Sequence, residues 1–138
     1  MSVKAGVLFK KGSGQGLFPR RNWKPRHCTL THDALRYYDC QDGRLKGQID
    51  LTHGDACVDL MPADCPKTGQ SAASVWRIAI QTPTRRFFVA APTEREMHDW
   101  AAALALVVKQ NNQGHHSQLV TGAARASIQH GGPSLQCA

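Results

Sequence analysis

The chain has 138 residues, of which 41% are hydrophobic and 20% are charged, so we expect one globular domain with a buried core. Its longest uninterrupted apolar run, residues 101–108, is far too short to span a bilayer. The net charge of +7 is uneven: residues 1–51 carry ten basic and four acidic side chains, whereas residues 52–138 carry seven and six. Positive charge concentrated in this way points to a polyanionic partner, such as a phospholipid headgroup, a membrane surface or a nucleic acid.

The first ninety residues show the pattern of short strands separated by turns. We expect seven strands, and they cover residues 3–11, 23–31, 35–38, 45–51, 56–61, 75–81 and 85–90. A glycine-rich segment at 12–16 opens a long loop after the first strand, and residues 62–74 form a second loop that is rich in turn-forming residues. Asp42 and Gly43 form the strongest hairpin signal in the chain, which predicts a tight turn between the third and fourth strands.

The pattern changes after Pro92. Residues 93–96, Thr-Glu-Arg-Glu, fit a capping box at the start of a helix. Met97, Trp100, Leu104 and Val108 then follow at spacings of three to four, which predicts an amphipathic helix that ends near residue 110. Residues 111–138 contain few large apolar side chains, so we expect a domain over 1–110 and a flexible C-terminal tail over 111–138.

Seven short strands followed by one capped helix with a central tryptophan resemble the pleckstrin homology (PH) domain. Trp100 matches the hallmark tryptophan of that family, and the resemblance covers about residues 3–110. The segments Gly-Val-Leu-Phe-Lys at 6–10, Trp-Lys-Pro-Arg-His-Cys-Thr-Leu at 23–30 and Leu-Arg-Tyr-Tyr at 35–38 resemble the phosphoinositide-binding subset. The resemblance implies a mainly β fold: a seven-stranded, partly open antiparallel barrel of two near-orthogonal sheets, capped by one C-terminal α-helix.

The resemblance also implies a headgroup-binding site. Lys10 ends the first strand, and Lys24 and Arg26 form the basic-x-Arg pair of the second strand. Tyr37 of the third strand and Lys46 of the fourth stand at the places that complete the site. Because side chains alternate along a strand, Lys24 and Arg26 share one face, and Arg26 can hold a phosphate through two parallel hydrogen bonds. An inositol polyphosphate needs several cations that converge in this way.

Four residues of the long first loop suit contact with a membrane. Leu17 and Phe18 stand near its tip, next to Arg20 and Arg21. An apolar pair of this kind can enter the bilayer interface while the arginines meet anionic headgroups. The alternative is that Phe18 folds back onto the barrel.

Other functions are not supported by motifs. The sequence has no Gly-x-Ser-x-Gly, Gly-x-x-x-x-Gly-Lys or His-Glu-x-x-His, and its five cysteines form no Cys-x-x-Cys pair. We therefore expect no enzyme, metal or cofactor, and no recognisable module predicts nucleic-acid binding. The resemblance implies a cytoplasmic, peripherally membrane-associated module that binds a phosphoinositide headgroup, expected to be 3-phosphorylated. A phosphatidylserine-binding or protein-binding domain of the same fold remains the alternative.

Overall fold

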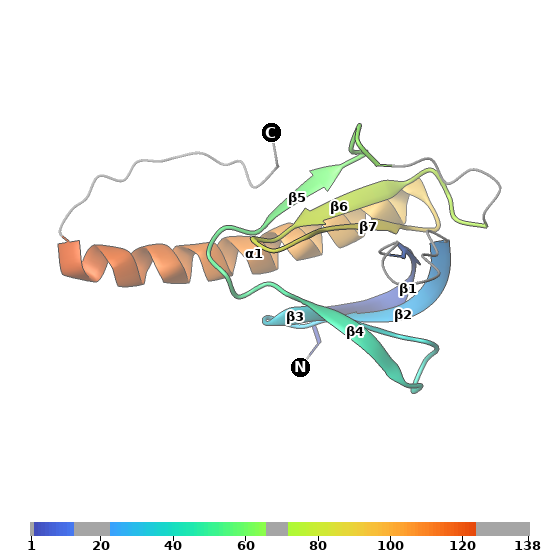
Figure 1. The fold of residues 1–138 in the computed structure, drawn as a ribbon, viewed down its shortest axis with the longest axis horizontal. Helices are drawn as coiled ribbons and strands as arrows, with labels where there is room; N and C mark the ends of the chain where they lie inside the picture. The colour runs from blue at the N-terminus through green and yellow to red at the C-terminus, as the bar shows by residue number, and fades with distance from the viewer. Residues whose placement is uncertain (1, 13–22, 66–71, 124–138) are drawn as a thin grey trace.

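The computed structural model describes residues 2–12, 23–65 and 72–123 (Figure 1). Within these residues the chain forms seven strands and then a helix: β1 (Lys4–Lys11), β2 (Trp23–Leu30), β3 (Ala34–Tyr38), β4 (Leu45–Asp50), β5 (Cys57–Leu60), β6 (Arg77–Gln81), β7 (Arg86–Ala90) and α1 (Glu94–Ala123). The strands pair antiparallel in the order β4-β3-β2-β1-β7-β6-β5. Because β4 and β5 end this order without pairing to each other in the described residues, the barrel is partly open. The predicted fold class is confirmed.

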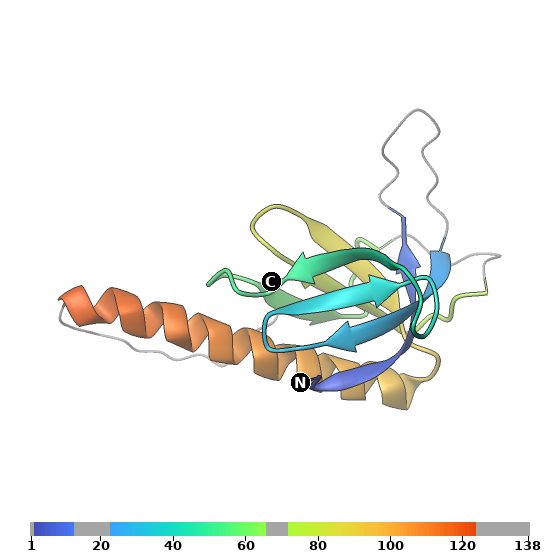
Figure 2. The same ribbon diagram turned by 90° about the horizontal axis from the view of Figure 1, so that it is seen from below.

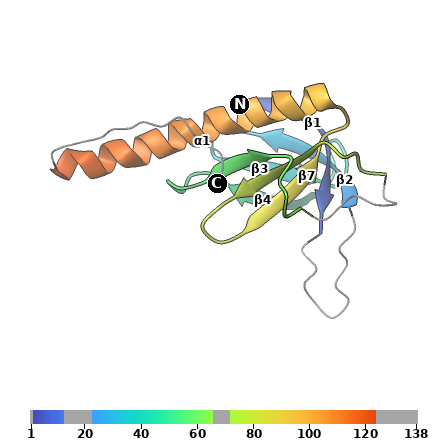
Figure 3. The ribbon, with the colours of Figure 1, turned by 90° about the horizontal axis from the view of Figure 1, so that it is seen from above.

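The sheet bends so that β1–β4 face β5–β7, and α1 runs along one end of the barrel and continues past it (Figures 1 and 3). The side chains between these layers form one apolar core that includes Leu8, Leu35, Ile80 and Trp100. Trp100 is 1% exposed, and the ammonium group of Lys4 lies 5.2 Å from the centroid of one of its rings. The closing helix is therefore held by a large buried aromatic ring, as its apolar stripe predicts.

The start of α1 agrees with its predicted cap, whereas its end does not. The backbone N–H of Glu96 donates a hydrogen bond to Thr93 Oγ1 at 3.1 Å, which is the contact expected of an N-cap. The helix then runs to Ala123, so the expected end near Gln110 is wrong. The division into a domain over 1–110 and a flexible tail over 111–138 stays a prediction. An apolar stripe marks only the part of a helix that packs on a core, so its loss after residue 110 does not mark the helix end. Residues 124–138 lie outside the described residues.

Two consecutive asparagines connect α1 to the barrel where the apolar stripe stops. Asn111 Nδ2 donates hydrogen bonds to the backbone oxygens of His32 and Leu51, each at 2.9 Å. Asn112 Nδ2 donates to the backbone oxygen of Ala56 at 3.4 Å. The helix is thus fixed by polar contacts to two interstrand turns beyond its last buried apolar residue.

Pro25 lies inside β2 without interrupting it. Pro25 pairs with Phe9 of β1, whereas the pairing of β2 with β3 begins only at His27. A proline lacks the N–H that a central strand needs, and on this part of β2 only one side of the backbone pairs. Lys24 therefore keeps its register opposite Lys10.

The described part of the chain contains no helix that combines the length and the apolarity needed to cross a membrane.

Candidate functional site

The inner face of β1 and β2 changes from apolar to basic along the strands. Leu8 pairs with Arg26, and Lys10 pairs with Lys24. Since paired residues of antiparallel strands share a face, these three cations project from the same face as the buried side chain of Leu8. Lys24 is exposed, whereas Lys10 and Arg26 are half-buried. The pairing of two lysines is unfavourable by itself, because like charges lie directly opposite each other.

Lys10 occupies the centre of this basic cluster. Its Nζ lies 4.7 Å from the centroid of the Tyr37 ring and 5.6 Å from that of Phe87, and it donates a 3.3 Å hydrogen bond to the backbone oxygen of Lys11. Burial, and then the neighbouring charges of Arg85 and Arg26, lower the pKa of Lys10 from 10.5 to about 8. An anion bound here would stabilise the charged ammonium group.

Tyr37 comes to the cluster because β4 leaves room for its ring. Tyr37 pairs with Gly47, and a Cβ atom at position 47 would overlap the Tyr37 hydroxyl and ring. Glycine is therefore the residue that lets the ring lie flat across β4 toward Lys10. Burial raises the pKa of Tyr37, with Arg85 and Arg26 opposing the shift, so its hydroxyl stays protonated at neutral pH and can donate a hydrogen bond.

Lys46 lies on β4, next to the residue that pairs with Tyr37. The β3–β4 register shifts here, since Tyr37 pairs with Gly47 and Tyr38 with Leu45, so Lys46 is the extra residue of a bulge. Its side chain is exposed. The pKa of Asp39 is lowered mainly by a hydrogen bond from the Arg44 backbone, and Lys46 contributes to the same shift. Lys46 thus lies near the tip of the β3–β4 hairpin, whereas Lys10, Arg26 and Tyr37 lie together.

Arg85, in the turn before β7, also belongs to the cluster, although it was not among the predicted site residues. Its guanidinium lies 4.4 Å from the centroid of Phe87, the ring that Lys10 also approaches. Arg85 is the neighbouring charge with the largest effect on the pKa values of Lys10 and Tyr37. The sequence holds a signal for this position, because Arg85 precedes the buried residues Phe87 and Val89 at two-residue spacings, which put all three on one face of the strand.

The predicted membrane-contact residues Leu17, Phe18, Arg20 and Arg21 lie outside the described residues.

A family model for the PH domain matches residues 2–109, and the chain belongs to this family. The protein daughter of sevenless of Drosophila melanogaster is 30% identical over 116 residues, which cover 78% of this chain and 12% of that protein. The chain therefore spans a small part of that relative.

Solved structures of PH domains share the fold. The solution structure of the C-terminal PH domain of human pleckstrin is 26% identical, with a TM-score of 0.61 and coverage of 79% of this chain and 81% of that chain. A crystal structure of the pleckstrin domain in complex with D-myo-Ins(1,2,3,4,5)P5 is also 26% identical, with a TM-score of 0.55 and coverage of 78% and 98%. The Slm1 PH domain in complex with phosphoserine is 15% identical, with a TM-score of 0.56 and coverage of 78% and 96%, a likeness of fold alone.

Proposed function

We propose that this PH domain is a non-catalytic module that binds the headgroup of a phosphoinositide at Lys10, Arg26 and Tyr37. The observation that carries the proposal is the position of the Lys10 ammonium group, which is half-buried, close to two aromatic rings, and has its pKa lowered by two arginines. Among the described residues, no carboxylate forms an ion pair with Lys10 or Arg26. Like charges collected without a counterion favour an anionic ligand.

Each of these residues would make a different kind of contact with the headgroup. Arg26 can donate two parallel hydrogen bonds to one phosphate, Lys10 supplies a compact positive charge, and Tyr37 supplies a neutral hydroxyl donor. Lys24, opposite Lys10, and Lys46, on the β4 side, add cations at the margin of the site. The pleckstrin domain solved with an inositol pentakisphosphate, at 26% identity, supports the same class of ligand.

The basic-x-Arg pair at 24–26 follows the pattern of the phosphoinositide-binding subset and supports a phosphoinositide as the ligand. The proposal extends to a 3-phosphorylated headgroup as the preferred one. Binding would recruit the protein to the cytoplasmic face of a membrane as a peripheral protein. Leu17 and Phe18 would enter the bilayer interface, with Arg20 and Arg21 against anionic headgroups. Changing Leu17 and Phe18 to serine should weaken vesicle binding and leave binding of a soluble inositol phosphate unchanged.

Vesicle sedimentation tests the proposal. Phosphatidylcholine vesicles should contain phosphatidylinositol 3,4,5-trisphosphate, phosphatidylinositol 4,5-bisphosphate or phosphatidylserine, with total lipid charge matched between them. We expect the strongest binding to the 3-phosphorylated lipid at equal charge. Equal binding to all three would indicate attraction to charge alone, and preference for phosphatidylserine would favour the other lipid class. Absence of binding would leave a protein ligand as the function of this domain.

A further inference from the structure

Four side chains form a row across β1–β4 on the outer face of the sheet, away from the core. Val7 of β1 pairs with His27 of β2, which pairs in turn with Tyr38 of β3. Tyr38 also pairs with Leu45 of β4. Paired residues share a face, and Leu8, next to Val7, is buried in the core, so the row faces outward. These four strands lie in front in the view from below, and no other described element covers them (Figure 2).

The row is continuous and largely open to solvent. Val7 at one end is 50% exposed and Leu45 at the other is 48% exposed, whereas His27 and Tyr38 between them are half-buried. Single exposed apolar side chains are ordinary on protein surfaces. Here the two apolar ends are joined by an imidazole and an aromatic ring, and a connected surface of this kind marks an interaction site.

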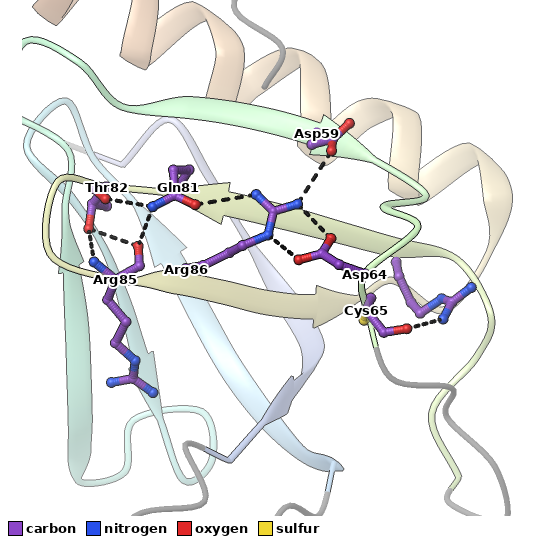
Figure 4. Close-up of polar contacts among 8 residues, drawn as sticks. Asp59, Asp64, Cys65, Gln81, Thr82, Arg85 and Arg86 are labelled. Carbon is purple, nitrogen blue, oxygen red and sulfur yellow. Dashed lines mark hydrogen bonds and ion pairs between the residues drawn. The ribbon is translucent and has the colours of Figure 1, made fainter. Parts of the chain in front are cut away.

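The outer face of β5–β7 is different, because the chain itself covers its apolar groups and pairs its charges. Phe88 of β7 packs in a second apolar cluster that includes Cys65. Arg86 donates from Nε and Nη2 to the two carboxylate oxygens of Asp64, at 2.7 and 2.8 Å, and lies 3.4 Å from an oxygen of Asp59 (Figure 4). Only the face of β1–β4 therefore presents a connected row of this kind among the described strands.

The charge around the row is positive. Arg36, two residues before Tyr38 on β3, projects from the same face, and Arg44 precedes Leu45 at an exposed position. Arg36 donates to Thr31 Oγ1 at 3.2 Å. In the part of the chain that the structure describes, no carboxylate forms an ion pair with Arg36 or Arg44. An apolar surface bordered by arginines without counterions is complementary to an apolar segment that carries carboxylates.

We propose that the outer face of β1–β4 is a docking surface for a protein segment whose apolar side chains are flanked by carboxylates. Tyr38 and Arg36 would make its central contacts, since tyrosine and arginine are enriched where protein interfaces gain most of their affinity. The basic cluster around Lys10 lies on the inner face of the same strands, so a partner on the outer face leaves it accessible. The inference goes beyond the proposed function and does not depend on it.

Selection from a phage-displayed library of random peptides on the full 138-residue chain tests this inference. The double change Val7→Thr with Leu45→Thr removes the apolar ends of the row and keeps residues that favour strands, and Arg36→Gln removes the charge. The matched controls are Val75→Thr, whose valine is 53% exposed before β6, and Arg95→Gln in the exposed first turn of α1. Thermal melts of all variants establish that they fold.

We expect the selected peptides to be rich in acidic and apolar residues. Their affinity should fall about tenfold in the double variant and in Arg36→Gln, and it should stay at the wild-type value in both controls. Equal binding by the double variant and by Val75→Thr would overturn the inference, as would peptides weakened by Arg26→Gln but not by Arg36→Gln, which occupy the inner face. A selection that yields no binding peptide would also overturn it.

Vesicles that contain phosphatidylserine separate a protein partner from a membrane. The chain with Val7→Thr and Leu45→Thr should sediment with these vesicles to the same extent as the wild type. A loss of sedimentation in this variant alone would assign the outer face to a membrane surface and would overturn the proposal of a protein partner.

Discussion

The ammonium group of Lys10 lies 4.7 Å from the centroid of the Tyr37 ring, and this contact connects the end of β1 to the inner face of β3. An aromatic face attracts a cation, most strongly where water is partly removed. Burial and the charges of Arg85 and Arg26 act in the opposite direction and lower the pKa of Lys10 to about 8. The rings therefore hold Lys10 in place, and the surplus positive charge around it remains for an anionic ligand to neutralise.

Headgroup affinity should fall as the pH rises through about 8, because the lowered pKa of Lys10 lies there. A bound phosphate stabilises the charged ammonium group, so it raises the pKa of Lys10 and binding takes up a proton. Apart from the ligand, the ionisable groups that act on Lys10 are Arg85, Arg26, Cys28 and Lys11. Burial raises the pKa of Cys28 to about 12, so its thiol stays neutral across this range.

The measurement is calorimetric affinity for a soluble inositol polyphosphate between about pH 7 and pH 9, on either side of the lowered Lys10 pKa. The control variant Lys10→Arg keeps a positive charge at every pH in this range and also corrects for ionisation of the phosphates. The wild-type affinity should fall relative to that of Lys10→Arg. A ratio of affinities that does not change with pH would show that Lys10 does not titrate in the binding reaction.

Gly47→Ala should weaken headgroup binding by moving Tyr37. The added methyl group would overlap the Tyr37 ring, which must then leave its place across β4 and its contact with Lys10. Gly114→Ala is the matched control, because a Cβ atom there meets nothing within 4 Å, and alanine in a helix is favoured over glycine by about 1 kcal/mol. We expect reduced affinity only for Gly47→Ala, with altered near-ultraviolet circular dichroism of its tyrosines. Unchanged affinity would mean that Tyr37 is not needed in this position.

Most of the fold was predictable from the sequence because local signals agree with the tertiary structure. Strand alternation and the stripe that contains Trp100 encode the burial pattern that the barrel requires, and Asp42-Gly43 marks the turn between two of its strands. The end of α1 was not predictable in this way. Asn111 carries no apolar signal, and its partners, the backbone oxygens of His32 and Leu51, are distant in sequence.

The candidate site was predictable only in part, for a similar reason. Lys10, Lys24 and Arg26 lie on the first two strands, which are consecutive in the chain and pair antiparallel. Their convergence therefore follows from side-chain alternation and register. Arg85 reaches the same place through the pairing of β1 with β7, which joins segments far apart in the chain. The two-residue spacing from Arg85 to Phe87 and Val89 indicates which face of the strand carries the Arg85 side chain. Which residues of other strands lie near Arg85 depends on the order of the strands in the sheet.

Trp100→Ala should destabilise the domain by about 3–5 kcal/mol, the usual cost of truncating a buried aromatic side chain. Trp100 is almost completely buried, and it packs in the main core between the helix and the strands. The control is Leu106→Ala on the same helix, whose side chain is 51% exposed. Urea denaturation measures both changes. Equal, small effects of the two substitutions would show that the ring does not support the core.

Asn111→Ala should lower the free energy of unfolding by about 1–3 kcal/mol, because it removes two hydrogen bonds to backbone oxygens of the barrel. Gln110→Ala, at the preceding exposed position of α1, is the control and should have little effect. Removing residues 114–138 should also have little effect, since Asn111 and Asn112 are retained. The prediction fails if Asn111→Ala unfolds at the same urea concentration as Gln110→Ala.

Calorimetry of D-myo-Ins(1,3,4,5)P4 with Arg26→Ala tests most directly whether the basic cluster at the end of β1 and the start of β2 binds the headgroup. The matched control is Arg36→Ala, because Arg36 precedes Tyr37 on β3 and projects from the opposite face of the strand. With both variants folded by thermal melt, Arg26→Ala should lose about tenfold to hundredfold in affinity, and Arg36→Ala should bind nearly as the wild type does. Equal affinities of the two variants for the soluble headgroup would contradict the account.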